Sequence, residues 1–303
     1  AMERAAQMHT LDVWYYHLDT EAVLAVFEAS SSRRAEKSAR KLVKKARSRT
    51  HQQTLEKLTQ VKAGQRRIIS DPPLLVPLRE IALEQQLSGE DLRWIEGGAI
   101  ENTWAQYLDS LPDERRYLLQ QFRLEDVALR VGGVGSVGTH CWIVLLKGGA
   151  GDDWLLLQLK EAGSSVLEPH LGKRGSAGHA ARVVTGQRLM QAASDMFLGW
   201  HSSELSGREY YWRQLRDMKG SADVEAMDED GFKTYVQLCS WCLARAHART
   251  GDEAAIRGYI GKNDSFAKVI ADFAAAYADQ TERDYQALVA AVESGRIVAQ
   301  TGI

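Results

Sequence analysis

A glycine-rich stretch followed directly by strand-forming residues constrains this 303-residue chain more than any other feature. Residues 130–139 read RVGGVGSVGT, in which Gly133, Gly135 and Gly138 satisfy the pattern G-x-G-x-x-G. In a dinucleotide-binding fold the third glycine opens a helix whose N-terminus faces the pyrophosphate. Here residues 139–146 read THCWIVLL, and β-branched and aromatic residues of this kind favour a strand. The stretch therefore predicts a hairpin between two strands and argues against a dinucleotide-binding unit.

The residues after this hairpin predict a third strand that carries a lysine. Residues 148–153 read GGAGDD and predict a turn, and residues 154–160 predict the strand that ends at Lys160. In protein kinases a glycine loop between two strands covers the phosphates of ATP, and a lysine on the third strand neutralises their charge. We therefore expect Lys160 to pair with nucleotide phosphates and the loop residues to cover them; these are Gly133, Gly135, Ser136 and Gly138. The alternative is a glycine-rich hairpin with a simply exposed lysine, since single motifs also arise by chance.

The partner of this lysine is left open by the sequence. A kinase lysine pairs with a glutamate on the following helix, but the predicted helix 180–194 has no glutamate and only Gln187 in its interior. Glu161 and Glu168 are the alternative partners. Arg216 follows the predicted strand 209–215, where a kinase has the hinge between its lobes. We expect Arg216 and its charged neighbours Arg213, Asp217 and Lys219 either to line the ligand site or to lie in a solvated surface loop.

The rest of the chain is mostly helical and predicts an α+β fold. Residues 1–60 read as helix, and a hairpin is expected at Ala63 and Gly64. From Gly231 onward the chain reads as helix, over residues 232–249, 253–260 and 265–293. We expect three parts: an N-terminal helical arm (1–60), a kinase-like small lobe with an antiparallel sheet (61–222), and a helical lobe (223–303).

Composition and charge narrow the class of protein. Hydrophobic residues make up 45% of the chain, which is enough for a core and excludes wholesale disorder. The longest apolar runs are far too short to cross a bilayer, and no secretory signal is visible, so we expect a cytoplasmic protein with no membrane partner. Three cysteines, an odd number, fit a reducing compartment better than a disulfide framework.

A basic stretch at residues 33–49 carries nine Lys and Arg against the single acid Glu36. A solvated helix face is the simpler interpretation, and a contact with phosphate or nucleic acid is the alternative. Because no zinc finger or aromatic stacking platform accompanies the stretch, we do not expect a nucleic-acid partner.

Two further motifs resemble known sites, and we interpret both as structural. Cys239 and Cys242 form C-x-x-C, and His247 follows five residues later as a possible third zinc ligand. Nothing nearby supplies a fourth ligand, so we predict that the cysteines are small buried packing residues. His247 and Asp252 resemble a kinase H-R-D loop, but Arg257 stands where the metal-binding asparagine belongs. We therefore expect His247 to pack between helices.

Several longer blocks resemble a bacterial family, the domain of unknown function 2252. These are residues 134–139 (VGSVGT), 158–162 (QLKEA), 165–169 (SVLEP), 186–195 (GQRLMQAASD), 213–221 (RQLRDMKGS) and 243–249 (LARAHAR). The resemblance covers most of the chain and corresponds to the C-terminal part of the family. Complete members carry, upstream of this part, the blocks G-D-x-H-x-x-N-F-G and F-D-x-N-D-F-D. Those blocks resemble the catalytic loop and metal-binding aspartate of aminoglycoside-phosphotransferase-like kinases, and neither is present here.

Motif and resemblance together predict ATP binding in a phosphotransferase-like protein. ATP and magnesium are the expected cofactors, and the phosphate acceptor is not specified by the sequence. Because the catalytic-loop blocks are missing and the chain starts in a helical pattern, we expect phosphate transfer only from a longer form of the protein. Two alternatives stay open: a non-catalytic kinase-like binding module, and a binder of nucleic acid or another anionic partner through the basic arm.

Overall fold

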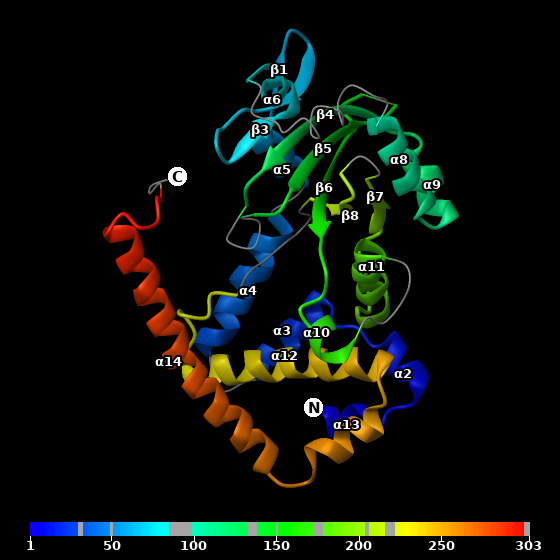
Figure 1. The fold of residues 1–303 in the computed structure, drawn as a ribbon. Helices are drawn as coiled ribbons and strands as arrows, with labels where there is room; N and C mark the ends of the chain where they lie inside the picture. Colours follow the sequence, from blue (N-terminus) through cyan, green and yellow to red (C-terminus); the bar gives the residue numbers. More distant parts are fainter. Residues whose placement is uncertain are drawn as a thin grey trace. The chain divides into compact units, whose positions relative to one another are not determined.

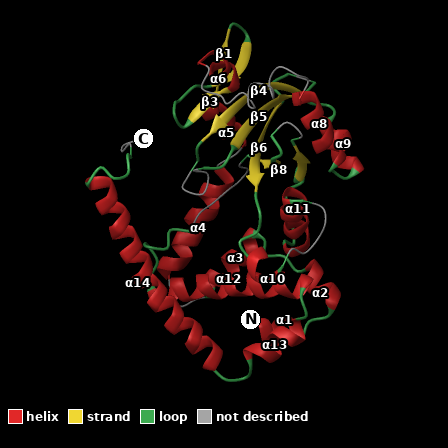
Figure 2. Ribbon diagram, in the orientation of Figure 1, coloured by secondary structure: helices red, strands yellow, loops and turns green. Residues whose placement is uncertain are grey.

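The computed structural model describes residues 1–29, 33–48, 51–84, 99–132, 138–149, 151–172, 178–203, 206–215 and 222–299. Helices and antiparallel strands combine as the predicted α+β fold (Figures 1 and 2). The chain divides into two compact units, one formed by residues 1–15 and 238–303 and the other by residues 16–237.

The described part of residues 1–58 is mostly helical, as predicted, and it contains five separate helices. These are α1 (Met2–Ala5), α2 (Thr10–Tyr15), α3 (Thr20–Glu28), α4 (Arg33–Ser48) and α5 (His51–Leu58). Asp19 starts α3 because its carboxylate accepts a hydrogen bond from the backbone N–H of Ala22 at 2.7 Å. The predicted hairpin follows as β1 (Thr59–Lys62) and β2 (Gln65–Ile68), and its two turn residues both have positive φ, 49° at Ala63 and 77° at Gly64.

The larger unit is built on a six-stranded antiparallel sheet in the order β3-β4-β5-β6-β8-β7 (Figure 2). Its strands are β3 (Leu75–Pro77), β4 (Arg123–Arg130), β5 (Cys141–Lys147), β6 (Trp154–Ala162), β7 (Gly199–Ser202) and β8 (Glu209–Gln214). The predicted hairpin is β4 and β5, and the predicted lysine-bearing strand is β6. Helices α6 (Leu78–Glu84), α8 (Ala99–Asp109), α9 (Asp113–Leu119), α10 (Glu168–Leu171) and α11 (His179–Met190) complete the unit with the start of α12 (Glu229–Thr250).

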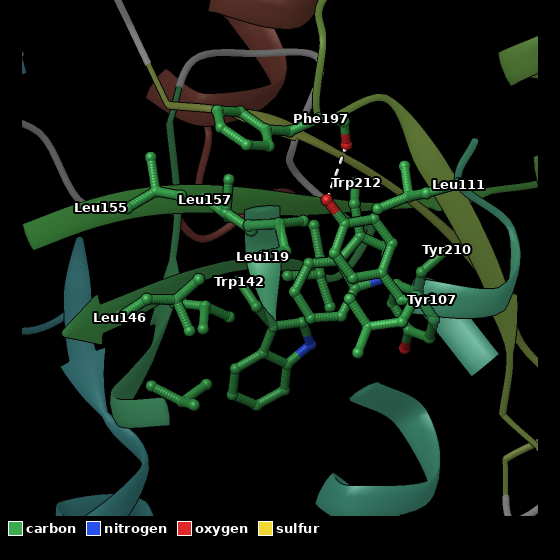
Figure 3. Close-up of a cluster of buried hydrophobic side chains, with 14 of the residues drawn as sticks. Tyr107, Leu111, Leu119, Trp142, Leu146, Leu155, Leu157, Phe197, Tyr210 and Trp212 are labelled. Atoms are coloured by element: carbon green, nitrogen blue, oxygen red, sulfur yellow. Dashed lines mark hydrogen bonds between the residues drawn. The ribbon is translucent and has the colours of Figure 1, made fainter. Parts of the chain in front are cut away.

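One face of the sheet, here called the α8 face, holds the larger hydrophobic cluster (Figure 3). Its strand residues pack against α8 and α9; they are Val127, Trp142, Val144, Leu146, Leu155, Leu157, Leu159, Tyr210 and Trp212. Tyr107 of α8 has no exposed surface, stacks on Trp212 at 4.3 Å between ring centroids, and donates a hydrogen bond to the carbonyl of Phe197 at 2.7 Å. Burial raises the pKa of Tyr107 well above its usual value, so the phenol stays a donor. Gly199 lies so close that a Cβ there would sit 2.7 Å from the Tyr107 ring.

The opposite face, here called the α5 face, is apolar over only part of its area. Ala128, Ile143, Leu145, Leu156 and Leu215 pack there against Leu55 of α5, Ile68 of β2 and Leu75 of β3. The buried carboxylate of Asp126 ties β2 to this sheet, because it accepts from the Ile68 N–H at 2.8 Å and from Arg79 at 2.6 Å. Beyond Ile143, toward the glycine loop, the residues on this face become polar.

A buried histidine in the larger unit predicts a pH dependence of its stability. His201 is 2% exposed, and its Nδ1 atom accepts a hydrogen bond from the indole N–H of Trp212 at 2.7 Å. Burial lowers the pKa of His201 from 6.5 to about 4. The unfolded chain therefore takes up a proton near pH 6.5 and the folded chain only near pH 4, so stability is lost as the pH falls through this window. Between pH 7.5 and pH 5, His201 alone lowers the free energy of unfolding by about 2 kcal/mol.

Glutamine cannot titrate, so His201→Gln should lose less stability than the wild type when the pH falls from 7.5 to 5. Urea unfolding at the two pH values measures this difference in the free energy of unfolding. His170→Gln, at an exposed histidine, is the matched control and should keep the wild-type pH dependence. An identical pH dependence in His201→Gln and wild type would contradict the assignment.

The smaller unit joins the N-terminal helices to the C-terminal ones. The guanidinium of Arg249 lies 4.0 Å from the centre of the Trp14 ring and donates to the Trp14 carbonyl at 2.8 Å. Arg257 and Glu3 form an ion pair at 2.7 Å, which lowers the pKa of the Glu3 carboxyl. The helices α13 (Glu253–Ile260) and α14 (Ser265–Glu293) have the bounds that the sequence predicted.

Candidate functional site

Lys160 lies in a row of side chains that crosses the α5 face beside the glycine loop. Cys141, the first residue of β5 after the loop, pairs with Lys160 of β6, and Lys160 pairs with Tyr211 of β8. Side chains alternate along a strand, so Lys160 shares a face with Leu156, whereas Leu159 belongs to the α8 face. The predicted lysine therefore projects from the polar part of the α5 face, close to where the loop ends.

The neighbouring row on this face adds an amide and a second cation. Gln158 pairs with Arg213 of β8, and the Gln158 amide donates to the sulfur of Cys141 at 3.1 Å. Arg213 is two residues from Tyr211, which makes it the diagonal neighbour of Lys160 across the two strands. We call the five residues Cys141, Gln158, Lys160, Tyr211 and Arg213 the lysine patch.

The charges in the lysine patch are positive and have no acidic partner within it. Among the described residues, no carboxylate lies within 4.0 Å of the charged groups of Lys160 or Arg213. Burial raises the pKa of the Cys141 thiol, and the Gln158 hydrogen bond and the charges of Lys160 and Arg130 oppose this shift. Burial also raises the pKa of Tyr211, with the Arg213 charge acting in the opposite direction. At neutral pH both groups are therefore neutral donors beside two cations, a combination suited to phosphate oxygens.

The two glutamates considered as partners of Lys160 are engaged elsewhere. Glu161 points to the α8 face, where its carboxylate accepts from the backbone N–H of His140 at 3.0 Å and contacts the His140 ring at 2.9 Å. Arg208 lies 3.6 Å from the same carboxylate, and the hydrogen bonds and charges of these neighbours lower the pKa of Glu161 although burial raises it.

Glu168, at the start of α10, belongs to a separate cluster. Its carboxylate accepts from the Ser165 N–H at 3.3 Å and lies 3.8 Å from Arg182 and 3.9 Å from His179. In the described part of the chain, neither Glu161 nor Glu168 contacts Lys160.

Gln187 lies on the side of α11 that packs on the sheet. It follows the buried Val184 by three residues, and α11 contacts β6, β7 and β8 (Figure 1). The carboxylate of Glu209, on the same face as Tyr211, accepts from the Ala180 N–H at 2.9 Å and so fixes the start of this helix. No hydrogen bond joins the described side chains of Gln187 and Lys160.

The glycine loop is described only at its two ends. Gly133, Gly135, Ser136 and Arg216, four of the predicted site residues, lie outside the described residues. Gly138 has φ of +79°, a left-handed conformation that favours glycine, and open space where a Cβ would stand. The loop leaves β4 after Arg130 and returns at Cys141, so both of its ends border the lysine patch.

Gln158, Cys141 and Tyr211 were not predicted as site residues. The alternation along the strands would have placed each of them on one face, but only once the pairing of β6 with β8 was known. Helix α11 and strand β7 separate these two strands in the chain, so the pairing is not visible in the local pattern.

The cysteine and histidine interpretations in α12 need correction. Cys239, Cys242 and His247 were predicted to be packed, and all three are exposed. The buried side of this helix carries Trp241 and Ala244. Successive residues of a helix are rotated by about 100°, so Cys239, Cys242 and His247 lie on other sides of it. Among the described residues, no group of three or more His, Cys, Asp or Glu side chains is placed to hold a metal ion.

The basic stretch forms the amphipathic helix α4. Ala39 and Val43 are buried, whereas Lys37, Lys41 and Lys44 are exposed. Arg40 forms ion pairs with Glu36, at 3.0 Å, and with Glu28 of α3. The two acids therefore neutralise part of the basic charge.

Comparison with known proteins identifies the family. The model of the family described as "Uncharacterized protein conserved in bacteria (DUF2252)" matches residues 1–291. The chain therefore belongs to the DUF2252 family, and the match spans nearly the whole chain rather than a C-terminal part of it. No curated protein and no solved structure matches the chain.

Within the described ranges, every helix is too short or too polar to cross a bilayer.

Proposed function

We propose that this protein binds ATP or a similar nucleoside triphosphate, with its phosphates between the glycine loop and the lysine patch. The observation that carries the proposal is the position of Lys160, a half-buried cation beside the end of the loop with no acidic partner among the described residues. A buried or half-buried cation without a counter-ion is costly, and a phosphate oxygen would supply that counter-ion. Arg213 adds a second charge on the same face.

The order of elements along the chain supports a kinase-like small lobe within residues 61–222, set between the helical arm (1–60) and the helical lobe (223–303). Strands β4, β5 and β6 and then helix α11 follow one another as the first three strands and the glutamate-bearing helix do in kinases. In this proposal Gly133, Gly135, Ser136 and Gly138 approach the phosphates through backbone N–H groups, and Arg216 lines the site after β8. Gln187 stands on α11 in place of the kinase glutamate, so it would offer its amide as a hydrogen-bonding group rather than a charge.

Magnesium would accompany the proposed nucleotide, coordinated by its phosphate oxygens. Among the described residues, no cluster of carboxylates is placed to hold the ion. What these residues would do is hold and orient a triphosphate: Lys160 and Arg213 offset its charge, and the Gln158 amide and Tyr211 hydroxyl lie within the same patch.

The direct test is stabilisation by nucleotide. A ligand present at 100 times its Kd stabilises the folded state by about 2.7 kcal/mol, which raises the melting temperature of a chain of this size by several degrees. We expect this shift with ATP and a much smaller one with adenosine, which has no phosphates. Equal shifts with both compounds, or none with ATP, would contradict the proposal and favour a partner bound through the basic helix α4.

A second experiment separates the proposed phosphotransferase-like protein from a non-catalytic binding module. Nucleotide turnover would be compared between residues 1–303 and a form extended upstream to include the two blocks that the family resemblance implies. Turnover in the extended form, with nucleotide binding in both, supports a phosphotransferase. Binding without turnover in either form supports a binding module.

A further inference from the structure

A shallow depression of about 340 Å³ lies at the end of the sheet remote from the lysine patch. It is lined by the residues after α9, the first residue of β4, the last residue of β5 and the glycine-rich turn that follows; these are Gln120, Gln121, Phe122, Arg123, Lys147, Gly148, Gly149 and Gly151. Lys147 is six residues from Cys141 along β5, which is about 20 Å at the rise of a strand. The depression is therefore separate from the proposed nucleotide site.

Two cations on paired strands line this depression. Arg123 of β4 and Lys147 of β5 are directly opposed partners in the antiparallel register. Like charges in such a position destabilise a sheet unless something offsets them. Lys147 has no carboxylate within 4.0 Å among the described residues, and its ammonium lies 5.3 Å from the centre of the Trp154 ring, which positions the charge without neutralising it.

The acids nearby offset only part of this charge. The Glu125 carboxylate lies 3.8 Å from Arg123 and also within 4.0 Å of Arg67, so it is shared between two arginines. The Asp153 carboxylate lies against Gly148, so close that it would overlap a Cβ on that glycine. The described residues of the lining hold two cations, two carboxamides and three glycines, of which Gly149 and Gly151 are exposed, and no acidic side chain.

We propose that this depression binds a phosphate-type oxyanion, either inorganic phosphate or the phosphate group of a small ester. The anion would lie between Arg123 and Lys147 and accept hydrogen bonds from both, with the carboxamides of Gln120 and Gln121 at its rim. The glycines of the turn allow close approach, because a Cβ added to Gly149 would meet nothing within 4 Å.

The test is calorimetric titration with inorganic phosphate and, separately, with glycerol 3-phosphate. Both titrations use the Lys160→Met protein, so that the lysine patch does not contribute. We expect Lys147→Met, added to this background, to weaken binding of the preferred ligand about tenfold, whereas Lys62→Met, at an exposed lysine of β1, leaves it unchanged. The ligand whose affinity falls more in Lys147→Met identifies the source of the phosphate.

A second readout distinguishes an anion site from an ordinary structural lysine. In phosphate-free buffer Lys147→Met should melt at a higher temperature than its parent, because one of two opposed cations is gone, and phosphate should no longer raise that temperature. Unchanged phosphate affinity in Lys147→Met, or no binding of either ligand at millimolar concentration in the Lys160→Met parent, would overturn the proposal.

Discussion

Lys160→Met is expected to weaken ATP binding by about tenfold to a hundredfold, corresponding to the roughly 1.5–3 kcal/mol of a hydrogen bond to a charged group. Methionine keeps most of the apolar stem of lysine, so the substitution removes the charge and little of the packing. Lys160 is a cation beside the returning end of the glycine loop, on the strand that pairs directly with β5. Its loss therefore removes a direct partner of the phosphates, and calorimetric titration with ATP measures the effect.

The control for this experiment is Lys62→Met, which removes the same charge at an exposed position in β1. It should bind ATP as the wild type does. The Lys160→Met protein without ligand should be at least as stable as the wild type, because no described acid loses its partner. If Lys160→Met and wild type bind ATP equally well, Lys160 has no role in holding phosphates.

The largest effect on stability is expected at Tyr107. Tyr107→Ala should lower the free energy of unfolding of the larger unit by about 3–5 kcal/mol, as for other large aromatic residues replaced in a core. The ring is fully buried, stacks on Trp212 and fills the space that Gly199 leaves open. Urea unfolding followed by tryptophan fluorescence reports this change directly, because Trp212 is the stacking partner.

Two further variants serve as references for this change in stability. Tyr107→Phe keeps the ring and loses only the hydrogen bond to the Phe197 carbonyl, so about 1 kcal/mol should be lost. Tyr117→Ala, at a residue that is 73% exposed, should change stability by less than about 0.5 kcal/mol. A Tyr107→Ala protein as stable as the Tyr117→Ala protein would show that the cluster on the α8 face does not hold the sheet together.

The elements that the sequence predicted well are those with a strong local pattern. Strand β5 is a continuous run of buried apolar residues, and the hairpin of β1 and β2 turns at Ala63 and Gly64, whose positive φ angles suit a tight turn. Helices α13 and α14 have the bounds that the residue pattern predicted. Each of these depends on residues that are neighbours in the chain.

The parts of the site that the sequence did not predict depend on residues that are distant in the chain. Tyr211 joins the lysine patch only because β8 pairs with β6 across the connection through α11 and β7. The interpretation of Cys239 and Cys242 as buried was wrong for a related reason, since burial depends on which side of α12 meets other elements. Residue type alone favoured burial of cysteine, and the packing of the helix decided otherwise.

The alternation of Lys160 and Glu161 along β6 gives this strand two surfaces of opposite sign. The lysine faces the patch beside the glycine loop, and the glutamate next to it binds His140 on the other side of the sheet. A shift of one residue in the pairing of β5 with β6 would exchange them, and a surface that attracts anions would become one that repels them. The contacts of Glu161 with the backbone and ring of His140 oppose that shift at the residue next to Cys141. Glu161, on the face opposite the proposed nucleotide site, thus stabilises the register that keeps Lys160 on the side of that site.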